Sequence, residues 1–405
     1  MAKKEQAISL AGMDAHSEKI ELCLTRWSHG TDPQVRRSIT TSLAALEATY
    51  AAQVPAGTLT VLEASTNAFS IARRLGRIGY EAKVLTADTV AGMSRGDRVN
   101  DRIDARNLAV AYARGGAREV LVPAERHEQW RDIWHGYRCA VKDSVKWSNR
   151  IWAFCSGHGF ELPTRLRRRK AAQVRAQVTG LGWDDEQAFH VNLLLGEYEH
   201  ACGVRDCYLR RIERIVAGNT EMIRVMQVPG IRFVIAFALV TYIEDARRFA
   251  TTRKLVSYIG LNPRVCESGK QKGHRATSSY GRRDLKTAMV EAAQTALRHG
   301  DGGMHRWARR KIAEGKHRNE VIVALARKMV CHVWHILMGH PPPEVEPSRT
   351  YVTKLTTLGY QLGSESIRAM GYHSAKEYAL ALCSEFYPAT CNKGPRLQTV
   401  PLASA

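Results

Sequence analysis

Short apolar runs bounded by polar turns predict several strands in the N-terminal part of the chain. The runs at 8–14 (ISLAGMD) and 20–26 (IELCLTR) are separated by the turn AHSEK, a pattern typical of a β-hairpin. A third strand is expected near 38–41. The segments 59–65 (LTVLEAS) and 82–88 (AKVLTAD) are predicted to be buried strands, because each is short and mostly apolar.

Helix-like spacing connects and follows these strands. The segment 66–80 (TNAFSIARRLGRIGY) predicts a helix, with Thr66 or Asn67 as its N-cap. The apolar spacing of 99–114 predicts another helix, and the glycine pair after it is a common helix stop. Strands and helices in this order predict a mixed sheet covered by helices, which is an α/β domain.

The middle of the chain changes character, since strand patterns are absent from residue 125 to about 226. Long helices are expected over 125–160 and 165–226. The second opens with a basic run that is either a solvated helix face or a set of phosphate contacts. Its basic residues are Arg165, Arg167, Arg168, Arg169 and Lys170.

The C-terminal part is expected to be compact and mainly helical. Two short helices within 230–261 precede a Gly/Lys-rich loop, and helices follow over 284–298 and 319–338. The tail that begins with three prolines at 341 has only weak helix patterns. The expected domains are an α/β domain at 1–124, a helical linker region at 125–225, a compact domain at 226–340 and an extension of unknown role at 341–405.

Composition narrows the class of partner. The chain has 60 Lys and Arg against 39 Asp and Glu, so its formal net charge of +21 favours a polyphosphate partner. Nine scattered cysteines without a C-x-x-C pair argue against a disulfide framework or a zinc module, and they favour a reducing cytosol. The longest apolar run, 234–243, is about half of what a membrane-spanning helix needs, so no membrane is expected.

Four carboxylates in the N-terminal part are candidate metal ligands. Asp14 ends the first strand and Glu63 lies inside a buried strand, where an unpaired charge is costly. Asp101 and Asp104 are three residues apart on one helix face, where their charges repel unless a cation lies between them. The alternatives are a turn residue for Asp14, a hydrogen-bonded site for Glu63 and a salt-bridged helix face for the pair.

Together the four acids fit the oxygen ligands of one or two Mg²⁺ ions, which act in phosphodiester chemistry. The strand order with its leading hairpin is that of an RNase H-like fold. The order of an acid on each of two strands and then an acid pair on a helix resembles the RuvC type of that fold.

A second candidate centre is the loop 261–283, where Ser268 is surrounded by basic residues. Cations that stabilise charge on phosphate would let a serine hydroxyl attack phosphorus. The alternative is a basic loop that grips phosphates with Ser268 as a turn residue. The candidate nucleic-acid contacts are Arg264, Lys270, Lys272, His274, Arg275, Arg282 and Arg283.

These features in this order resemble the DEDD transposases of the IS110 insertion-sequence family. The resemblance covers residues 8–335 and includes the strand-borne acids, the D-x-x-D pair, and the segment KLVSYIGLNPRVCESGKQKGHR, in which a G-L-x-P loop precedes S-G. It implies a RuvC-like domain, a coiled-coil segment and a transposase domain, acting in the bacterial cytosol or at the nucleoid.

The resemblance also implies a mechanism. Asp14, Glu63, Asp101 and Asp104 would hold Mg²⁺, and Ser268 would form a covalent phosphoserine link to DNA. The active site would be shared between subunits of a homodimer or homotetramer, and a bridge RNA would pair with donor and target DNA.

One departure concerns the serine. The family often has two adjacent serines before the glycine, whereas this chain has Glu267-Ser268, so Ser278 and Ser279 are secondary candidates. Two other functions stay open: a RuvC-like nuclease or Holliday-junction resolvase that uses activated water, and a noncatalytic nucleic-acid-binding protein.

Overall fold

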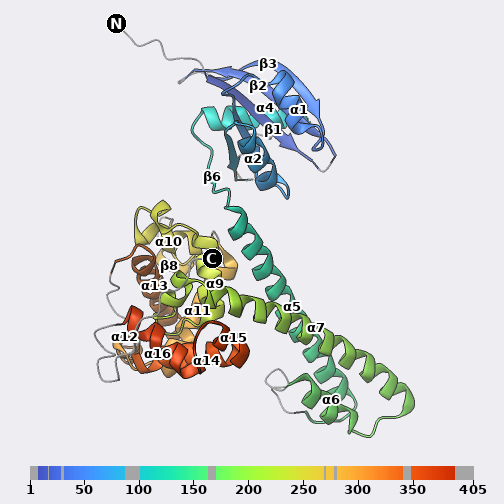
Figure 1. Cartoon of the computed structure of the whole chain (residues 1–405), viewed down its shortest axis with the longest axis vertical. Coiled ribbons are helices and arrows are strands. Elements are labelled where there is room, and N and C mark those ends of the chain that lie inside the picture. The colour runs from blue at the N-terminus through green and yellow to red at the C-terminus, as the bar shows by residue number, and fades with distance from the viewer. Residues whose placement is uncertain are drawn as a thin grey trace. The chain divides into compact units, whose positions relative to one another are not determined.

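The computed structural model describes residues 8–16, 18–28, 32–86, 101–162, 170–268, 271–277, 281–340 and 348–387. The chain divides into two compact units, residues 1–125 and 126–405 (Figure 1). Each unit has its own hydrophobic core. The expected mixed α/β sheet followed by a mostly helical remainder is confirmed, and the finer division into four segments stays a prediction.

The N-terminal unit is built on a six-stranded sheet of order β3-β2-β1-β4-β5-β6. Its strands are β1 (Ile8–Ala15), β2 (Ile20–Trp27), β3 (Gln34–Thr41), β4 (Leu59–Glu63), β5 (Ala82–Leu85) and β6 (Glu119–Val120). The first three form antiparallel pairs, which confirms the expected hairpin. β4 is parallel to β1 and to β5, and β6 is antiparallel to β5. β3 begins earlier than the expected 38–41, because its first residues are exposed and give no buried apolar pattern in the sequence.

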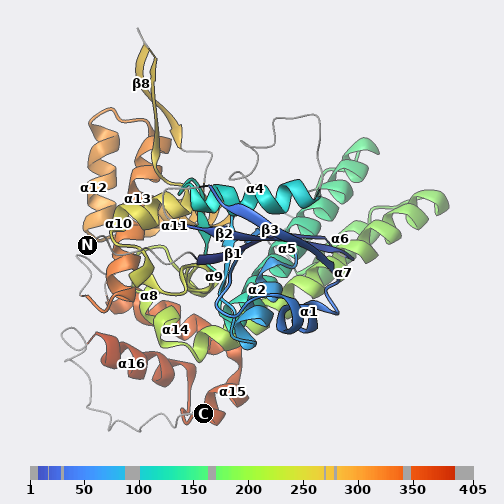
Figure 2. The same cartoon turned by 90° about the horizontal axis from the view of Figure 1, so that it is seen from above.

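Helices cover both faces of this sheet. Figure 2 shows α1 (Leu46–Gln53) and α2 (Ala68–Arg77) on one face and α4 (Asp101–Ala113) on the other. Side chains of β1 point alternately to the two faces of the sheet. Met13 packs with α1 and α2 on one face, and Leu10 packs with α4 on the other.

At Gly12 the backbones of β1 and α4 approach each other closely. A Cβ atom on this residue would lie 1.7 Å from the backbone oxygen of Ala105 and 3.2 Å from the backbone nitrogen of Ala109. Neither neighbour is a side chain that could move aside. The absence of a side chain at Gly12 therefore allows the helix to rest directly on β1.

The C-terminal unit begins with two long helices, α5 (Glu125–Gly157) and α7 (Asp185–Ala217). The far end of this pair packs around α6 (Ala171–Thr179) through a core that includes Ile151 and Leu195. The single helix expected over 165–226 is wrong, because the chain turns after α6 and starts again at Asp184. The Asp184 carboxylate accepts a hydrogen bond of 2.8 Å from the Gln187 backbone N–H, as an N-cap does.

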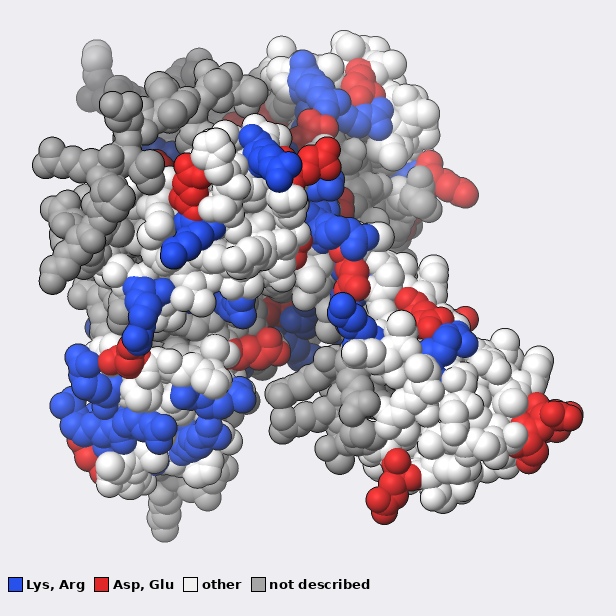
Figure 3. Space-filling model, turned by 60° about the horizontal axis from the view of Figure 1, so that its bottom comes forward, with Lys and Arg blue, Asp and Glu red and all other residues white. Residues whose placement is uncertain are grey.

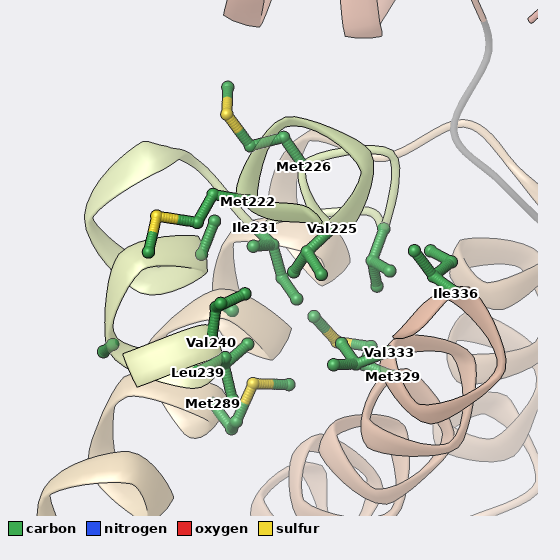
Figure 4. Close-up of a cluster of buried hydrophobic side chains, with 14 of the residues drawn as sticks. Met222, Val225, Met226, Ile231, Leu239, Val240, Met289, Met329, Val333 and Ile336 are labelled. Carbon is green, nitrogen blue, oxygen red and sulfur yellow. The ribbon is translucent and has the colours of Figure 1, made fainter. Parts of the chain in front are cut away.

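The main core of this unit lies among short helices. They are α8 (Thr220–Val225), α9 (Phe233–Ile243), η2 (Ala246–Arg248), α10 (Thr252–Ile259), α11 (Arg283–His299), α12 (Gly303–Ala313) and α13 (Arg318–Leu337). Figure 4 shows part of this core, to which Met222, Leu239, Met289 and Met329 contribute from four of these helices. The apolar run at 234–243 is the buried helix α9. Among the described residues, no helix combines the length and apolarity that crossing a membrane requires.

The segment expected to be a loop at 261–283 contains a β-hairpin instead. β7 (Pro263–Ser268) pairs antiparallel with β8 (Gln271–Thr277), so the correction is from loop to two-stranded ribbon. Its strands have no alternating apolar face, and the period-2 pattern was therefore missing from the sequence.

Residues 348–387 are folded onto this core. It contains α14 (Ser348–Leu362), α15 (Ser364–Ala369) and α16 (Ala375–Phe386). The Tyr351 hydroxyl donates to the carbonyl of Ile223 at 3.0 Å. The buried Lys354 ammonium donates to the carbonyls of Met226 and Val228 at 2.9 and 3.0 Å. These bonds satisfy carbonyl groups at the end of α8, so α14 is part of the fold.

Replacing Gly12 with alanine should loosen α4. The added methyl group overlaps backbone atoms that cannot rotate away, so we expect a loss of roughly 1–3 kcal/mol of stability in the N-terminal unit. Hydrogen exchange of peptides from β1 and α4 measures this locally, as faster exchange in Gly12→Ala than in the wild type.

Gly76→Ala is the matched control. Gly76 lies near the end of α2, and a Cβ atom there would meet nothing within 4 Å. Alanine should therefore be neutral or stabilising by up to about 1 kcal/mol. Equal exchange of α4 in the wild type and Gly12→Ala would show that the contact at Gly12 does not hold the helix.

Candidate functional site

Strand register gathers three carboxylates on the face of the sheet that α4 covers. Asp14 lies two residues after Gly12, so both face α4. Asp14 pairs directly with Glu21 of β2, and antiparallel partners point to the same face. Met13 pairs with Leu62 of the parallel strand β4, so the following residues, Asp14 and Glu63, are neighbours along the sheet edge.

The first turn of α4 supplies the helix-borne acids. Asp101 and Asp104 lie in this turn, where a negative charge is favoured by the helix dipole. An Asp101 carboxylate oxygen lies 3.8 Å from Nε2 of His16, and the other lies 3.5 Å from Nζ of Lys19. His16 and Lys19 both come from the turn between β1 and β2.

Three groups come close enough to hold one ion. One ligand atom each from Asp14, His16 and Asp101 lies within 4.8 Å of the others. The His16 Nε2 atom is also 3.3 Å from an Asp14 oxygen. Glu63 and Asp104 are outside this group, although both interact electrostatically with Asp14. The structure therefore brings together two of the four predicted ligands directly and places the other two nearby.

The acids disfavour one another's ionised form. Burial raises the pKa of Asp14, the charge of His16 lowers it, and the charges of Asp101 and Asp104 raise it, with a net increase. Burial and the charges of Asp14 and Asp104 raise the pKa of Glu63. Such mutual repulsion is what a bound cation would relieve. The donor set is mostly carboxylate oxygen, which suits Mg²⁺.

Glu21 is a site residue that the sequence analysis missed. Its carboxylate is almost fully buried, accepts a 2.8 Å hydrogen bond from the Thr40 hydroxyl and lies 2.8 Å from Lys19 Nζ. Burial acts to raise the pKa of Glu21, but hydrogen bonds from Lys19 and Thr40 outweigh it and hold the pKa below its usual range. The hairpin itself was the available signal, because a four-residue turn after Ala15 places Glu21 opposite Asp14.

For the second candidate centre, the hairpin that carries Ser268, the structure describes the backbone. Ser268 ends β7 and pairs with Gln271 at the start of β8, next to the connection between the two strands. The backbones of Arg264, Lys272, His274 and Arg275 lie in the same hairpin. Lys270, Ser278 and Ser279 lie outside the described residues, as do Arg165, Arg167, Arg168 and Arg169. Lys170 is the N-cap residue of α6.

Two other predicted nucleic-acid contacts follow the hairpin. The Arg282 guanidinium carbon lies 3.8 Å from the centre of the Tyr242 ring, and an Arg282 nitrogen lies 3.3 Å from Asp284. Arg283 is exposed at the start of α11. These cations belong to the C-terminal unit, whereas the acids belong to the N-terminal one.

Comparison with known proteins is a source of evidence that does not depend on this geometry. Residues 222–309 match the model of a family described as Transposase IS116/IS110/IS902. The matched segment includes the β7–β8 hairpin and Ser268.

Curated relatives agree with this match. The chain is 24% identical to the transposase for insertion sequence element IS1328 of Yersinia enterocolitica, over 68% of this chain and 82% of that protein. It is 24% identical to a probable family 20 transposase of Pseudomonas aeruginosa, over 69% and 83%. It is 23% identical to the transposase for insertion sequence element IS1111A of Coxiella burnetii, over 68% and 77%. The chain is therefore similar to proteins named as transposases, which are enzymes that cleave and join DNA.

Replacing Glu63 with glutamine tests the repulsion among the acids. An acid whose pKa is raised by folding destabilises the folded state once it ionises, so at neutral pH without divalent cations Glu63→Gln should raise the thermal midpoint of the N-terminal unit. Added Mg²⁺ should stabilise the wild type, by about 2.7 kcal/mol at a hundred times its Kd, and should stabilise the variant less.

The matched control is Glu81→Gln, the same substitution at an exposed position of the same unit. It should leave both the midpoint and the response to Mg²⁺ unchanged. A Glu63→Gln variant that melts below the wild type without metal, or gains as much from Mg²⁺, would contradict the assignment of Glu63 to the acid cluster.

Proposed function

We propose that this protein is a transposase of the IS110/IS116 family that cleaves and rejoins DNA with Ser268 as nucleophile and a Mg²⁺ centre at the acid cluster. The observation that carries the proposal is the meeting of Asp14, Asp101 and their acidic neighbours at one sheet edge, in a chain whose residues 222–309 match a transposase family. The acid cluster alone would indicate only a metal centre, and the family match alone would indicate only DNA rearrangement.

The strand order supports a RuvC-like identity for the N-terminal unit. An antiparallel meander of three strands leads into parallel strands in the order β3-β2-β1-β4-β5, as in an RNase H-like sheet. In this arrangement the first strand, the fourth strand and a covering helix all bring acids to one edge. Asp14, Glu63 and the first turn of α4 occupy those positions.

The acid cluster would hold one or two Mg²⁺ ions through Asp14, Glu63, Asp101 and Asp104. When bound, such ions neutralise phosphate oxygens and lower the barrier to displacement at phosphorus. The protein's own contribution is to keep the acids close. Lys19 and His16 offset their charge, and Glu21 orients Lys19 through a 2.8 Å contact.

Ser268 would hold the cleaved DNA strand through a covalent bond until that strand is rejoined. Its hydroxyl oxygen forms a bond to phosphorus, its proton is released, and the displaced deoxyribose oxygen is protonated as it leaves. The phosphodiester becomes a phosphoserine ester, so a new DNA hydroxyl can displace the serine without an external energy source. The proposed nucleophile belongs to the C-terminal unit and the proposed metal ligands belong to the N-terminal unit. The reaction therefore needs residues from both units.

Other parts of the proposal concern partners. A bridge RNA that pairs with donor and target DNA, and a homodimer or homotetramer that completes the site, follow from the resemblance to the family, as does action in the bacterial cytosol. The net charge of +21 supports binding to polyphosphate. Figure 3 shows one face on which Lys and Arg side chains gather at the lower left, over α12 and the turn after it. Arg306, Arg309, Arg310, Lys316 and Arg318 are exposed there.

A second candidate function is a RuvC-like nuclease or junction resolvase that uses activated water. It is favoured by the location of the described group, since Asp14, His16 and Asp101 all belong to the N-terminal unit. In that case Ser268 would not react.

A covalent adduct separates the two functions. Protein, bridge RNA, Mg²⁺ and DNA carrying an element end are incubated, denatured and examined by gel electrophoresis for DNA attached to protein. We expect an adduct in the wild type and a loss of about a thousandfold or more in Ser268→Ala, because no other group supplies the attacking oxygen. Asp101→Asn should lose both cleavage and adduct.

Ser278→Ala and Ser279→Ala serve as controls with the same chemical change in the same segment of sequence. Both should form the adduct. Cleavage that persists in Ser268→Ala without any adduct would replace the proposed mechanism with that of the nuclease. Digestion of the RNA before the reaction should abolish site choice, and unchanged site choice would remove the RNA from the proposal.

A further inference from the structure

A cavity of about 460 Å³ in the C-terminal unit has four Lys or Arg side chains among its ten lining residues. His135, Arg138 and Lys142 reach it from α5. Arg282 and Arg283 reach it from the start of α11, far along the chain. The α5 residues were not among the nucleic-acid contacts expected from sequence, because they are spaced along a long helix with no basic run.

Aromatic rings hold two of these guanidinium groups. Arg282 lies 3.8 Å from the centre of the Tyr242 ring, and Arg138 lies 5.7 Å from that of Trp134. Stacking on a ring fixes the plane of a guanidinium group but does not neutralise it, as a carboxylate would. Arg138 therefore keeps its capacity to bind an anion. Arg282 donates from Nε and one terminal nitrogen to Asp284 at 3.3 Å, and the N–H groups of its other terminal nitrogen do not take part in that contact.

The cavity has one carboxylate, and that group is already engaged. Asp284 accepts a 2.9 Å hydrogen bond from the indole N–H of Trp134 and lies 3.3 Å from Arg282. Burial acts to raise the pKa of Asp284, but the charge and hydrogen bonds of its neighbours hold it below its usual range. It stays ionised and offsets one charge, so the lining keeps a positive excess.

The cavity lies where the chain returns from the β7–β8 hairpin. Gly281 has a φ of +99°, and a Cβ atom there would lie 2.6 Å from backbone atoms of Gly260. The next residue, Arg282, donates its backbone N–H to the carbonyl of Tyr258 at 3.0 Å. The foot of the hairpin is thereby fixed to α10, and Arg282 is directed to the cavity from a rigid position.

We propose that this cavity binds a backbone phosphate of DNA and so holds a DNA strand at the foot of the hairpin that carries Ser268. The inference rests on the proposed function in taking DNA as the polymer. A phosphodiester fits the lining, since planar guanidinium groups match its oxygens. His135, Lys142 and Arg283 are exposed, which leaves the cavity open to a continuing polymer.

The test compares two pairs of cations on the same helix. Arg138→Gln with Lys142→Gln removes two charges from the cavity. Lys146→Gln with Arg150→Gln removes an Arg and a Lys from outside the lining, where both lie over the Trp147 ring at 4.8 and 4.6 Å. The two double variants thus have the same change in net charge, and each gives up cation–π stacking on a tryptophan of α5.

Fluorescence anisotropy with labelled duplex DNA measures affinity over a series of salt concentrations. We expect the cavity variant to bind about tenfold or more weakly, with the slope of log K against log salt reduced by about 0.9 for each phosphate that is no longer neutralised. The control variant should change by about twofold or less. Circular dichroism melting of both variants checks that each is folded.

Three results would overturn the proposal. Equal losses of DNA affinity in the two double variants would show that the loss comes from the lower net charge and not from the cavity. A loss of affinity for an RNA of the same sequence, with DNA affinity unchanged, would make RNA the occupant. The third result is that inorganic phosphate binds the wild type but not the cavity variant, while both proteins bind DNA equally well. The cavity would then be a site for a free anion.

Ser268→Ala in the same assay separates this proposal from the proposed function. The serine variant should bind DNA as tightly as the wild type. If the wild type forms no covalent adduct while the cavity variant still loses DNA affinity, the serine mechanism fails and the phosphate cavity stands.

Discussion

The contact between Gly12 and the backbone of α4 determines where the acids of the N-terminal unit meet. Because a Cβ atom at this position would lie 1.7 Å from the Ala105 oxygen, the helix can rest on β1 only if the residue is glycine. Asp14 follows two residues later on the same face, and Asp101 lies one turn before Ala105 on the helix. One backbone contact therefore aligns a strand-borne and a helix-borne carboxylate.

Charge is organised in opposite ways in the two units. The acids of the N-terminal unit are crowded enough for burial and mutual repulsion to raise the pKa of Asp14 and Glu63, although His16 and Lys19 offset part of their charge. In the C-terminal cavity, aromatic rings hold arginines that a single carboxylate cannot neutralise. The first arrangement attracts cations and the second attracts anions.

Local patterns predicted the fold where one face of an element is buried. The hairpin, the two buried strands and the long helix α5 follow from periods of 2.0 and 3.6 residues. The same method missed the β7–β8 ribbon, which is held by backbone pairing without an apolar face. It also detected α14 only weakly, because this helix is anchored by Tyr351 and Lys354 bonding to distant carbonyl groups.

The sequence by itself determined which residue types were available and in what order: acids at two strand positions, an acid pair on a helix, and a serine among cations. Only the tertiary structure decided that His16 and Lys19 join the acids, and that α5 and α11 share a cavity. Periodicity is a property of neighbours along the chain. Strand register and helix packing set the distances between remote side chains, and those distances determine which charges interact.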